Sequence, residues 1–395
     1  MKQTFKKPEL LLPAGNLEKL KIACIYGADA VYIGGQKFGL RSGADNFSNE
    51  EIAEGCQFAK NYDCKVYVVL NAFLHNKDYD GIIPYVKFLE EAGVSALIIS
   101  DAGVITTVSK ACYIPIHLST QASCLNSETA KVWKKLGVTR IITGRELSVA
   151  EGGLIKKEAD IEVEMFIHGA MCSAYSGHCS ISNYTAGRDS NRGGCKQSCR
   201  FHYHIDNSED VIPLMSSKDL NGVALIDHFF KHEIDSVKVE GRMKSNLYVA
   251  ATCKAYRNII DEYYENRTVS TQTLENASKD LSLYPNRDYT EASLLEPANA
   301  DSIVKEINAP KNKYAYAGTV IKSTNEHNWV QLRNPVSQND TLTIISKQGN
   351  NKKINLEHLY NFKMQPIQKA RQDQVICIKL EKELDTGMVL CKANA

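Results

Sequence analysis

The chain of 395 residues lacks a long apolar run, because no window approaches the roughly 18 consecutive apolar residues that span a membrane. Its start, M-K-Q-T-F-K-K-P-E-L-L-L, holds a three-residue apolar run before Pro13, whereas a secretory signal needs about 7–15. We therefore expect a cytoplasmic protein with no membrane partner. In that compartment the 12 cysteines are expected to be reduced thiols rather than disulfides.

The sequence also lacks the motifs of several common enzyme classes. Neither H-E-x-x-H nor G-x-S-x-G is present, so the usual metallohydrolase and serine hydrolase signatures are missing. The C-x₃-C-x₂-C motif of radical enzymes that use S-adenosylmethionine is absent too. His178 and Cys179 are adjacent, and neighbours in sequence rarely present their side chains to each other, which disfavours a Cys–His peptidase pair.

Net charge is small, at +1, but it is unevenly distributed. Residues 310–395 carry 13 Lys and Arg against 7 Asp and Glu, which gives +6, and the preceding part carries 34 against 39, which gives −5. A basic C-terminal segment favours a polyanionic partner such as RNA. A soluble domain with surplus lysines has the same composition, and charge alone does not separate the two.

The first 245 residues alternate short apolar runs, rich in β-branched residues, with amphipathic helical stretches. This alternation predicts a parallel sheet covered by helices, and eight repeats predict a (β/α)₈ TIM-like barrel. A doubly wound open sheet is the alternative, although no G-x-G-x-x-G follows the first strand. The expected strands are Glu9–Pro13, Ala30–Ile33, Lys65–Leu70, Ala96–Ile99, Ile116–Ser119, Arg140–Thr143, Ile161–Ile167 and Ser236–Val239.

The seventh repeat departs from this pattern. After Ile161–Ile167, roughly 50 residues rich in Cys, Ser, Gly and Asn precede the next helical stretch, and such excursions are usually functional. A loop that follows a barrel strand lies on the catalytic face. We therefore expect a barrel at 1–270 with a cysteine-rich insertion at about 169–220, a helix and linker at 271–309, and a small basic all-β barrel at 310–395 that binds RNA.

Four cysteines of this insertion form a candidate metal-binding set with the spacing C-x₆-C-x₁₅-C-x₃-C, namely Cys172, Cys179, Cys195 and Cys199. Thiolates are soft ligands, and four of them suit either tetrahedral zinc or an iron–sulfur cluster. Structural zinc sites usually pair their ligands as C-x₂₋₄-C twice, whereas here only the second pair is close. The many Gly and Ser residues leave backbone N–H groups free to bond cluster sulfurs. The spacing therefore favours a cluster and leaves zinc as the alternative.

Polar residues at the expected strand ends are further candidates for the site. Arg145 and Arg242 have the planar guanidinium that grips a carboxylate bidentately, so they suit a small anionic substrate. The alternative is that such groups cap helices or line the polar rim of any barrel. The candidate catalytic residues are His168 and Glu240, and the candidate substrate-binding residues are Asn71, Asp101, Gln121, Arg145, Lys238 and Arg242.

The segment E-M-F-I-H-G-A-M-C-S-A-Y-S-G-H-C-S-I-S, residues 164–182, closely resembles the signature of the collagenase-like peptidase family, unclassified peptidase family thirty-two. The opening E-L-L-L-P-A-G-N with A-D-A-V-Y-I-G-G is similar to the family's start, and the β-rich tail resembles its C-terminal domain. Several members are RNA- or quinone-modifying hydroxylation proteins with a four-iron cluster. The resemblance thus implies a [4Fe–4S] cluster on the four cysteines above.

One barrel followed by a β tail is similar to the tRNA hydroxylation subgroup of that family. This resemblance implies formation of 5-hydroxyuridine at the tRNA wobble position with prephenate as hydroxyl donor, and an electron donor or a sister family subunit as further partners. Trp329, Tyr314 and Tyr316 of the tail are candidates for stacking on unpaired bases. A collagenase-like endopeptidase, ribosomal-RNA cytidine hydroxylation and a zinc-stabilised RNA-binding protein are the alternatives.

Overall fold

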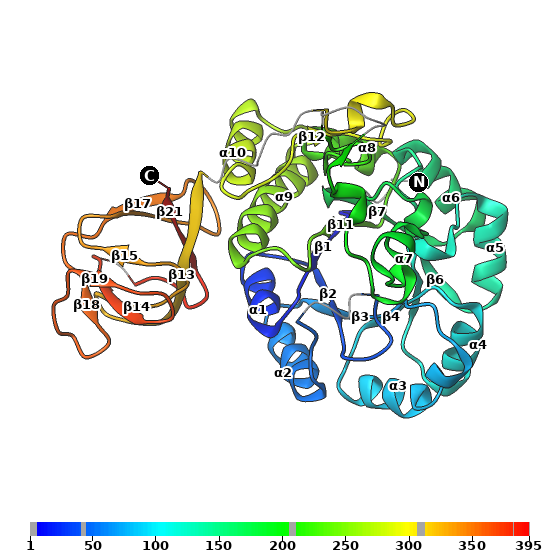
Figure 1. The fold of residues 1–395 in the computed structure, drawn as a ribbon, viewed down its shortest axis with the longest axis horizontal. Helices are drawn as coiled ribbons and strands as arrows, with labels where there is room; N and C mark the ends of the chain where they lie inside the picture. The colour runs from blue at the N-terminus through cyan, green and yellow to red at the C-terminus, as the bar shows by residue number, and fades with distance from the viewer. Residues whose placement is uncertain (1–5, 41–44, 205–210, 306–312, 382, 395) are drawn as a thin grey trace.

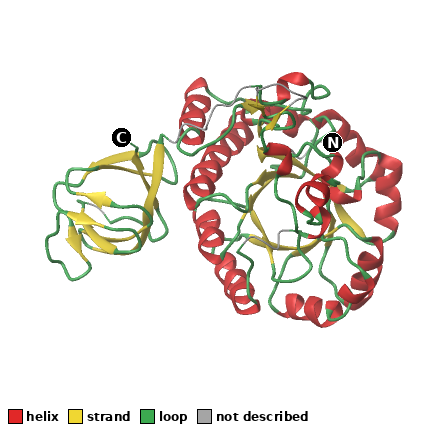
Figure 2. Ribbon diagram, viewed as in Figure 1, coloured by secondary structure: helices red, strands yellow, loops and turns green. Residues whose placement is uncertain are grey.

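The computed structural model describes residues 6–40, 45–204, 211–305, 313–381 and 383–394. These residues form a parallel barrel ringed by helices, with a smaller antiparallel domain beside it (Figures 1 and 2). Within these ranges, no helix is long and apolar enough to cross a bilayer.

Eight parallel strands close the barrel. They are β1 (Glu9–Pro13), β2 (Ala30–Gly34), β3 (Lys65–Leu70), β4 (Ala96–Ile99), β5 (Ile116–Leu118), β6 (Val138–Ile142), β7 (Glu162–Ala170) and β11 (Ser236–Glu240). Because β11 pairs with both β7 and β1, the sheet returns to its first strand. This closure confirms the predicted TIM-like barrel, and it excludes the doubly wound open sheet.

Helices cover the outside of the barrel, as the alternating pattern predicts. Two of them begin with a capping box, in which Ser48 or Ser148 exchanges hydrogen bonds with Glu51 or Glu151. The helices are α1 (Leu17–Ile25), α2 (Asn49–Lys60), α3 (Ile82–Glu91), α4 (Ala102–Ala111), α5 (Ser127–Lys135), α6 (Val149–Ala159), α8 (Ile226–Lys231), α9 (Asn246–Asn266) and α10 (Thr271–Leu281).

The cysteine-rich insertion lies between β7 and α8, as predicted. It contains a short helix, α7 (Ile181–Ala186), and a two-stranded pair, β8 (Tyr203–His204) and β9 (Val211–Ile212), neither of which the composition indicated. The chain then returns through β10 (Asp219–Asn221), which pairs antiparallel with β7.

Part of the segment expected to be a linker belongs to the barrel sheet. Strand β12 (Tyr289–Thr290) pairs with β10, and the nearby side chains of Tyr284 and Leu294 are 4% and 5% exposed. The Pro, Asn and Asp residues here do mark turns, but the apolar side chains between them pack on the barrel.

The C-terminal domain is an antiparallel sheet curved into a half-barrel. Its strand order is β17-β16-β21-β13-β14-β20-β18, with β15 and β19 paired separately. The last strand, β21, which the sequence pattern did not single out, lies near the middle. The strands are β13 (Tyr314–Thr324), β14 (His327–Leu332), β15 (Val336–Ser337), β16 (Thr341–Ile344), β17 (Lys352–Asn355), β18 (Tyr360–Asn361), β19 (Lys369–Ala370), β20 (Val375–Lys379) and β21 (Val389–Ala393).

Specific polar contacts join this domain to α1 and α9 of the barrel (Figure 1). The Tyr26 hydroxyl donates to the Ile345 carbonyl at 2.8 Å and accepts from the Val389 N–H at 3.0 Å. Tyr316, a candidate for base stacking, is also part of this junction, because its hydroxyl accepts a hydrogen bond from Asn246. Its ring is partly buried and packs against the barrel core, which favours a structural role over base stacking.

The barrel interior contains a buried carboxylate between two cations. Glu164 is 0% exposed, and it accepts hydrogen bonds from Arg140 Nη1 at 3.2 Å and from Lys238 Nζ at 2.9 Å. Arg140 also donates to Glu9 at 2.6 Å. Burial alone would raise the pKa of the Glu9 carboxyl, but Arg140 and Lys65 together lower it to about 2. The Glu9–Arg140 ion pair is therefore formed throughout the neutral pH range.

Replacing Arg140 with Gln should destabilise the fold by about 3–5 kcal/mol at pH 7, because it removes the buried cation that pairs with both Glu9 and Glu164. The folded pKa of Glu9 is depressed, so its ion pair contributes stability above the unfolded pKa of about 4.5 and loses it as pH falls towards 2. The decrease in the free energy of unfolding caused by R140Q should therefore be smaller below pH 4.5. Urea unfolding at pH 7 and pH 3 measures it, with exposed R371Q as control; an equal loss at both values would contradict the prediction.

Candidate active site at the barrel mouth

The candidate site lies at the carboxyl ends of the barrel strands, where the insertion folds over the opening. Figure 2 shows α7 of the insertion in front of the ring of strands. Arg192 donates to Asp78 at 2.7 Å in the loop after β3, and His178 is bonded to the Gln121 carbonyl after β5 at 2.5 Å. The Glu146 carboxylate, after β6, accepts from an insertion N–H at 2.5 Å. Three separate loops thus hold the insertion against the mouth.

The four insertion cysteines differ in exposure from all the others in the chain. Eight cysteines are buried, whereas Cys172 and Cys195 are exposed and Cys179 and Cys199 are half-exposed. Partial desolvation raises the pKa of the Cys172 thiol, and Cys199 and Cys179 lie near enough to raise it further. The four accessible thiols thus all belong to the insertion, whereas the buried cysteines belong to the barrel and the C-terminal domain.

The donor set can be tested against the two metals that the spacing allowed. Among the described residues, no three His, Cys, Asp or Glu side chains stand close enough together to hold a single metal ion. Ligands of one zinc ion must converge on a point, whereas the four thiolates of an iron–sulfur cubane each bind a different iron and stand farther apart. Four thiolates are soft ligands that suit either an iron–sulfur cluster or tetrahedral zinc.

Below the insertion, two cationic side chains lie close to one aromatic ring at the barrel interior. The Arg145 guanidinium lies 3.6 Å from the centroid of the Phe166 ring, and Lys238 Nζ lies 5.6 Å from the same ring. Lys238 is held from beneath by Glu164. Two of the predicted substrate-binding residues are therefore brought together, although Lys238 is 5% exposed and lies deeper.

Two further predicted residues, Asn71 and Gln121, meet across the ends of β3 and β5. The Asn71 Nδ2 group donates to Gln121 Oε1 and to Ser119 Oγ, each at 3.3 Å. Ser119 is also hydrogen-bonded to Gln121. These amides form a polar rim that is fixed in position by its own hydrogen bonds and by the contact of the Gln121 carbonyl with the insertion.

On the opposite side, Glu240 and Arg242 follow β11. Glu240 accepts a hydrogen bond from the Tyr32 hydroxyl at 3.0 Å, and Arg242 donates to Asn46 at 2.7 Å. The Arg242 guanidinium lies directly over Gly34, where any Cβ would clash with it. The absence of a Cβ at Gly34, the end of β2, therefore leaves room for the Arg242 guanidinium.

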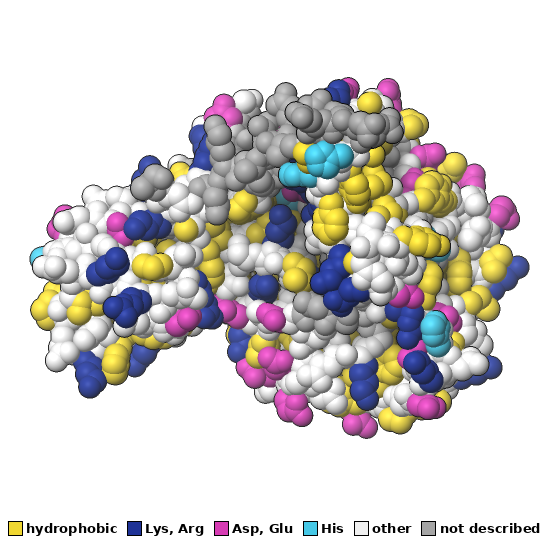
Figure 3. All heavy atoms as spheres, viewed as in Figure 1, with side chains coloured by type: hydrophobic (Ala, Val, Ile, Leu, Met, Phe, Trp, Pro, Cys, Tyr) yellow, Lys and Arg dark blue, Asp and Glu magenta, His cyan; other side chains and the backbone are white. Residues whose placement is uncertain are grey.

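Lys19 and Lys244 also belong to this cationic mouth, and sequence reasoning missed both. Burial lowers the pKa of the Lys19 ammonium, and Arg242 nearby lowers it further. Burial likewise lowers the pKa of Lys244, with Arg287 and Arg200 adding to the effect. Figure 3 shows Lys and Arg side chains gathered over the centre of the barrel face. The arrangement suits a small anion or a phosphate.

The Asp101 carboxylate is occupied by structural hydrogen bonds. Its carboxylate accepts from the Val104 N–H at 2.9 Å, which caps α4, and from the Tyr79 hydroxyl at 3.1 Å. A strand-end carboxylate that begins the next helix commonly does this. The geometry therefore favours the helix-capping role over substrate binding for this residue.

His168 faces away from the mouth, into the layer between the barrel and α9. It is 1% exposed, and its ring nitrogens lie 3.1 Å from the Tyr256 hydroxyl and 3.0 Å from the Tyr284 hydroxyl. Burial lowers the pKa of His168 to about 3, so the ring is neutral at physiological pH. A register shift between β7 and β11 at this level turns the side chain outward, which favours a structural role over the predicted catalytic one.

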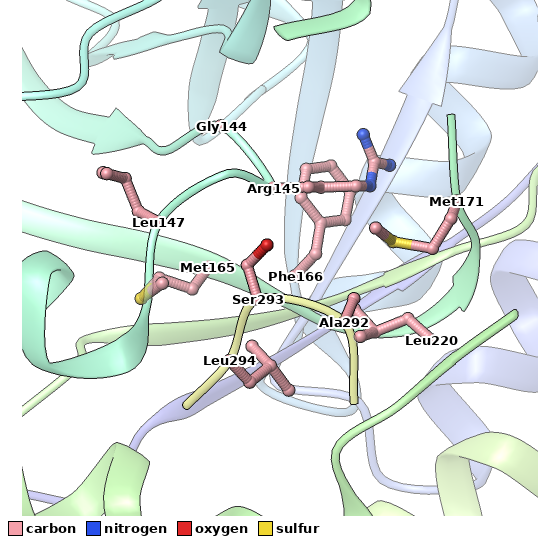
Figure 4. A pocket seen from close by; sticks show the side chains of 10 residues that line it. All are labelled: Gly144, Arg145, Leu147, Met165, Phe166, Met171, Leu220, Ala292, Ser293 and Leu294. Carbon is pink, nitrogen blue, oxygen red and sulfur yellow. The ribbon is translucent and has the colours of Figure 1, made fainter. Parts of the chain in front are cut away.

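A small apolar pocket lies next to Arg145 (Figure 4). Met171 from the start of the insertion and Leu294 from the segment after β12 are among its lining side chains. Its volume of about 10 Å³ is room for about one water molecule, so a substrate does not fit in it. Its lining side chains instead pack the insertion against the barrel.

The comparison with protein families agrees with the motif at residues 164–182. The model described as peptidase family U32 matches residues 15–303, and that of the peptidase family U32 C-terminal domain matches residues 312–390. The chain belongs to peptidase family U32.

Relatives within the U32 family carry names of two different kinds. The tRNA hydroxylation protein P1 of Bacillus subtilis is 42% identical, covering 98% of this chain and 96% of its own length. The tRNA hydroxylation protein P of Escherichia coli is 32% identical, over 98% and 97%. A collagenase of Porphyromonas gingivalis is 27% identical, over 73% of each chain.

The peptidase name of the U32 family has no support from the His178–Cys179 pair in this chain. The His178 ring is bonded to the Gln121 carbonyl and stands edge-on to Phe73, with ring centroids 5.4 Å apart. The histidine is therefore occupied in fixing the insertion to the barrel, and it is not oriented by a carboxylate as the base of a nucleophile would be.

Replacing His168 with Gln should make the stability of this U32 protein less dependent on pH. The folded pKa of about 3 lies below the unfolded value of 6.5, so the unfolded state binds a proton first and wild-type stability falls as pH drops below 6.5. Between pH 6.5 and pH 4 this amounts to roughly 3 kcal/mol. Unfolding free energies of wild type and H168Q at both values measure it. A constant difference between the two proteins would show that His168 is not buried in its neutral form.

Proposed function

We propose that this chain is a [4Fe–4S]-dependent tRNA hydroxylase that forms 5-hydroxyuridine at the wobble position, with prephenate as hydroxyl donor. The observation that carries the proposal is the placement of four accessible thiols on an insertion that is fixed over a cationic barrel mouth. In a TIM-like barrel this is the face on which chemistry takes place.

The names of the relatives support the RNA-modifying part of the proposal. Both tRNA hydroxylation proteins match nearly the full length of this chain, barrel and C-terminal domain together. The collagenase has a lower sequence identity and matches a smaller share of this chain.

The reaction balances without an external oxidant. Replacing the C5 hydrogen of uridine with a hydroxyl group oxidises the base by two electrons. A donor that gives up its hydroxyl group and takes a hydrogen in its place is reduced by the same two electrons. Prephenate carries such a hydroxyl group, and its two carboxylates suit the guanidinium and ammonium groups at the mouth.

The side chains at the mouth bind and orient the reactants. Arg242 would hold one carboxylate of the donor, with Lys19 beside it, and Arg145 would hold the second carboxylate or a phosphate of the RNA. The polar rim formed by Asn71 and Gln121 would lie beside the bound base. The insertion above them excludes water, which strengthens each of these electrostatic contacts.

Cys172, Cys179, Cys195 and Cys199 would hold the cluster. When bound, the cluster supplies either electron transfer or activation of the donor's hydroxyl group. The role of the protein is to place this chemistry next to the cationic pocket and to keep it attached through the contacts of Arg192 and His178 with the barrel loops.

Anaerobically purified protein should be brown and contain iron and acid-labile sulfide in equal amounts. Replacing Cys172 with Ala should remove most of both, because the cubane loses a ligand. The matched control is C56A, since Cys56 is 2% exposed on α2 and away from the insertion. Absorbance and elemental analysis provide the measurement. A colourless wild-type protein that contains zinc but no iron would refute the cluster assignment.

Incubation of the anaerobic protein with unmodified tRNA and prephenate labelled with ¹⁸O in its hydroxyl group should transfer the label to the wobble uridine. R242Q should lower kcat/KM for prephenate by about tenfold or more, because a charged hydrogen bond is lost. R242K should have an intermediate kcat/KM, because it keeps the charge but not the planar guanidinium. R371Q should behave as wild type. Mass spectrometry of digested tRNA gives the readout. In parallel incubations, label transfer to a cytidine of added ribosomal RNA but not to tRNA would overturn the substrate, and cleavage of added denatured collagen without label transfer to tRNA would overturn the reaction.

A further inference from the structure

The outer face of the C-terminal sheet carries a row of aromatic and basic side chains across four strands. In the strand register Lys322 is opposite Trp329, Trp329 is opposite Cys377, and Cys377 is opposite Tyr360. Directly paired residues point to the same side of a sheet, so this row lies on one face. We call it, together with the next row, the aromatic–lysine face.

The next row of the aromatic–lysine face is formed by His327 and Lys379. These two residues are paired, and each is two positions from a member of the first row on its own strand, which puts them on the same side. The opposite side of these strands is the domain core, where Val330, Ile376 and Ile378 are at most 2% exposed. The polar and aromatic side chains therefore face outward.

Both rings on this face have a lysine beside them. Lys322 Nζ lies 5.4 Å from the centroid of the Trp329 ring, and Lys379 Nζ lies 5.4 Å from that of Tyr360. Cys377 between the rings is 0% exposed although it is on the outer face, so the rings cover it. From strand spacing, the two rings stand roughly 10 Å apart.

The charges on this face are not neutralised by the protein. The two rows contain no Asp or Glu, and no ion pair of Lys322 or Lys379 is found within the described ranges. Elsewhere in the same domain Lys347 pairs with Asp385 at 2.9 Å, and Lys392 pairs with Asp340 at 2.6 Å. The two ammonium groups without an ion pair are thus the ones that lie beside the half-exposed rings.

The face is continuous with the junction to the barrel. One row nearer the barrel, Thr319 is opposite Gln331, and the Thr319 hydroxyl donates to Glu18 of α1 at 3.1 Å. Figure 3 shows Lys and Arg side chains of this domain on the same side of the molecule as those at the barrel mouth. The C-terminal domain and the barrel mouth therefore both present basic side chains on the viewed side of the molecule.

We propose that the aromatic–lysine face binds an unpaired loop of the RNA substrate, with bases stacked on Trp329 and Tyr360 and the flanking phosphates held by Lys322 and Lys379. The proposal rests on the proposed tRNA hydroxylase function. Rings flanked by free cations are the usual platform for single-stranded nucleic acid, because every base has a face that stacks and every nucleotide brings a phosphate. An acidic protein would use the lysines but not the rings.

The test uses the tryptophans of the full-length protein, of which the chain has two. The other one, Trp133, lies on α5 against the barrel core, so W133F leaves Trp329 as the sole reporter. An RNA hairpin with an unpaired loop should quench its fluorescence, and a fully paired duplex of equal charge should quench it much less. Equal quenching by the duplex or by polyglutamate would overturn base stacking.

Affinity measurements on variants complete the test. W329A should weaken hairpin binding about tenfold, whereas W329F should retain it. K322Q/K379Q keeps both rings, and it should lower the slope of log affinity against log salt by about 1.4, or roughly 0.7 for each lost phosphate contact. The control is K347Q, whose ammonium is ion-paired away from the face. Unchanged affinity and slope in K322Q/K379Q would refute the proposal.

Kinetics separate failure of this face from failure of the proposed function. K322Q/K379Q should raise KM for tRNA about tenfold and leave kcat and iron content unchanged. Normal KM in that variant, with active wild-type enzyme, would overturn the face alone. If the wild-type protein neither binds the hairpin nor modifies tRNA, both proposals fail together.

Discussion

The arrangement of the mouth depends on one buried carboxylate, Glu164. Burying a carboxylate is costly unless cations and hydrogen bonds replace the water it has lost, and here Arg140 and Lys238 do so. Lys238 is thereby fixed near the Phe166 ring, and the same ring contacts the Arg145 guanidinium. Interior charge therefore determines where the cations of the candidate site stand.

The strand that carries Glu164 also leads directly into the cysteine-rich insertion. Gly169, near its end, has φ +105° and approaches the Glu240 carbonyl so closely that a Cβ would collide with it. This contact lets β7 and β11 close the barrel while the chain turns outward towards Cys172. Barrel closure, the buried Glu164 carboxylate and the first cysteine are thus linked along one short stretch of chain.

Much of the fold was predictable because buried parallel strands are recorded in the sequence as short β-branched runs. All eight barrel strands were located within three residues of their observed ends. The short β12 and the C-terminal β21 were not, since Tyr289–Thr290 lies among turn residues and Val389–Ala393 is brief and partly polar. Their pairing with β10 and with β13 and β16 comes from tertiary contacts that no local pattern contains.

By itself the sequence supplied the candidates for the site: four closely spaced cysteines in a polar excursion, and cationic side chains at strand ends. Only the tertiary structure decided which candidates share a site. Strand register turns His168 outward and Lys238 inward, helix capping occupies Asp101, and chain folding brings Lys19 beside Arg242 from more than 200 residues away. The physical reason is that side-chain chemistry is local, whereas burial, orientation and proximity belong to the packed fold.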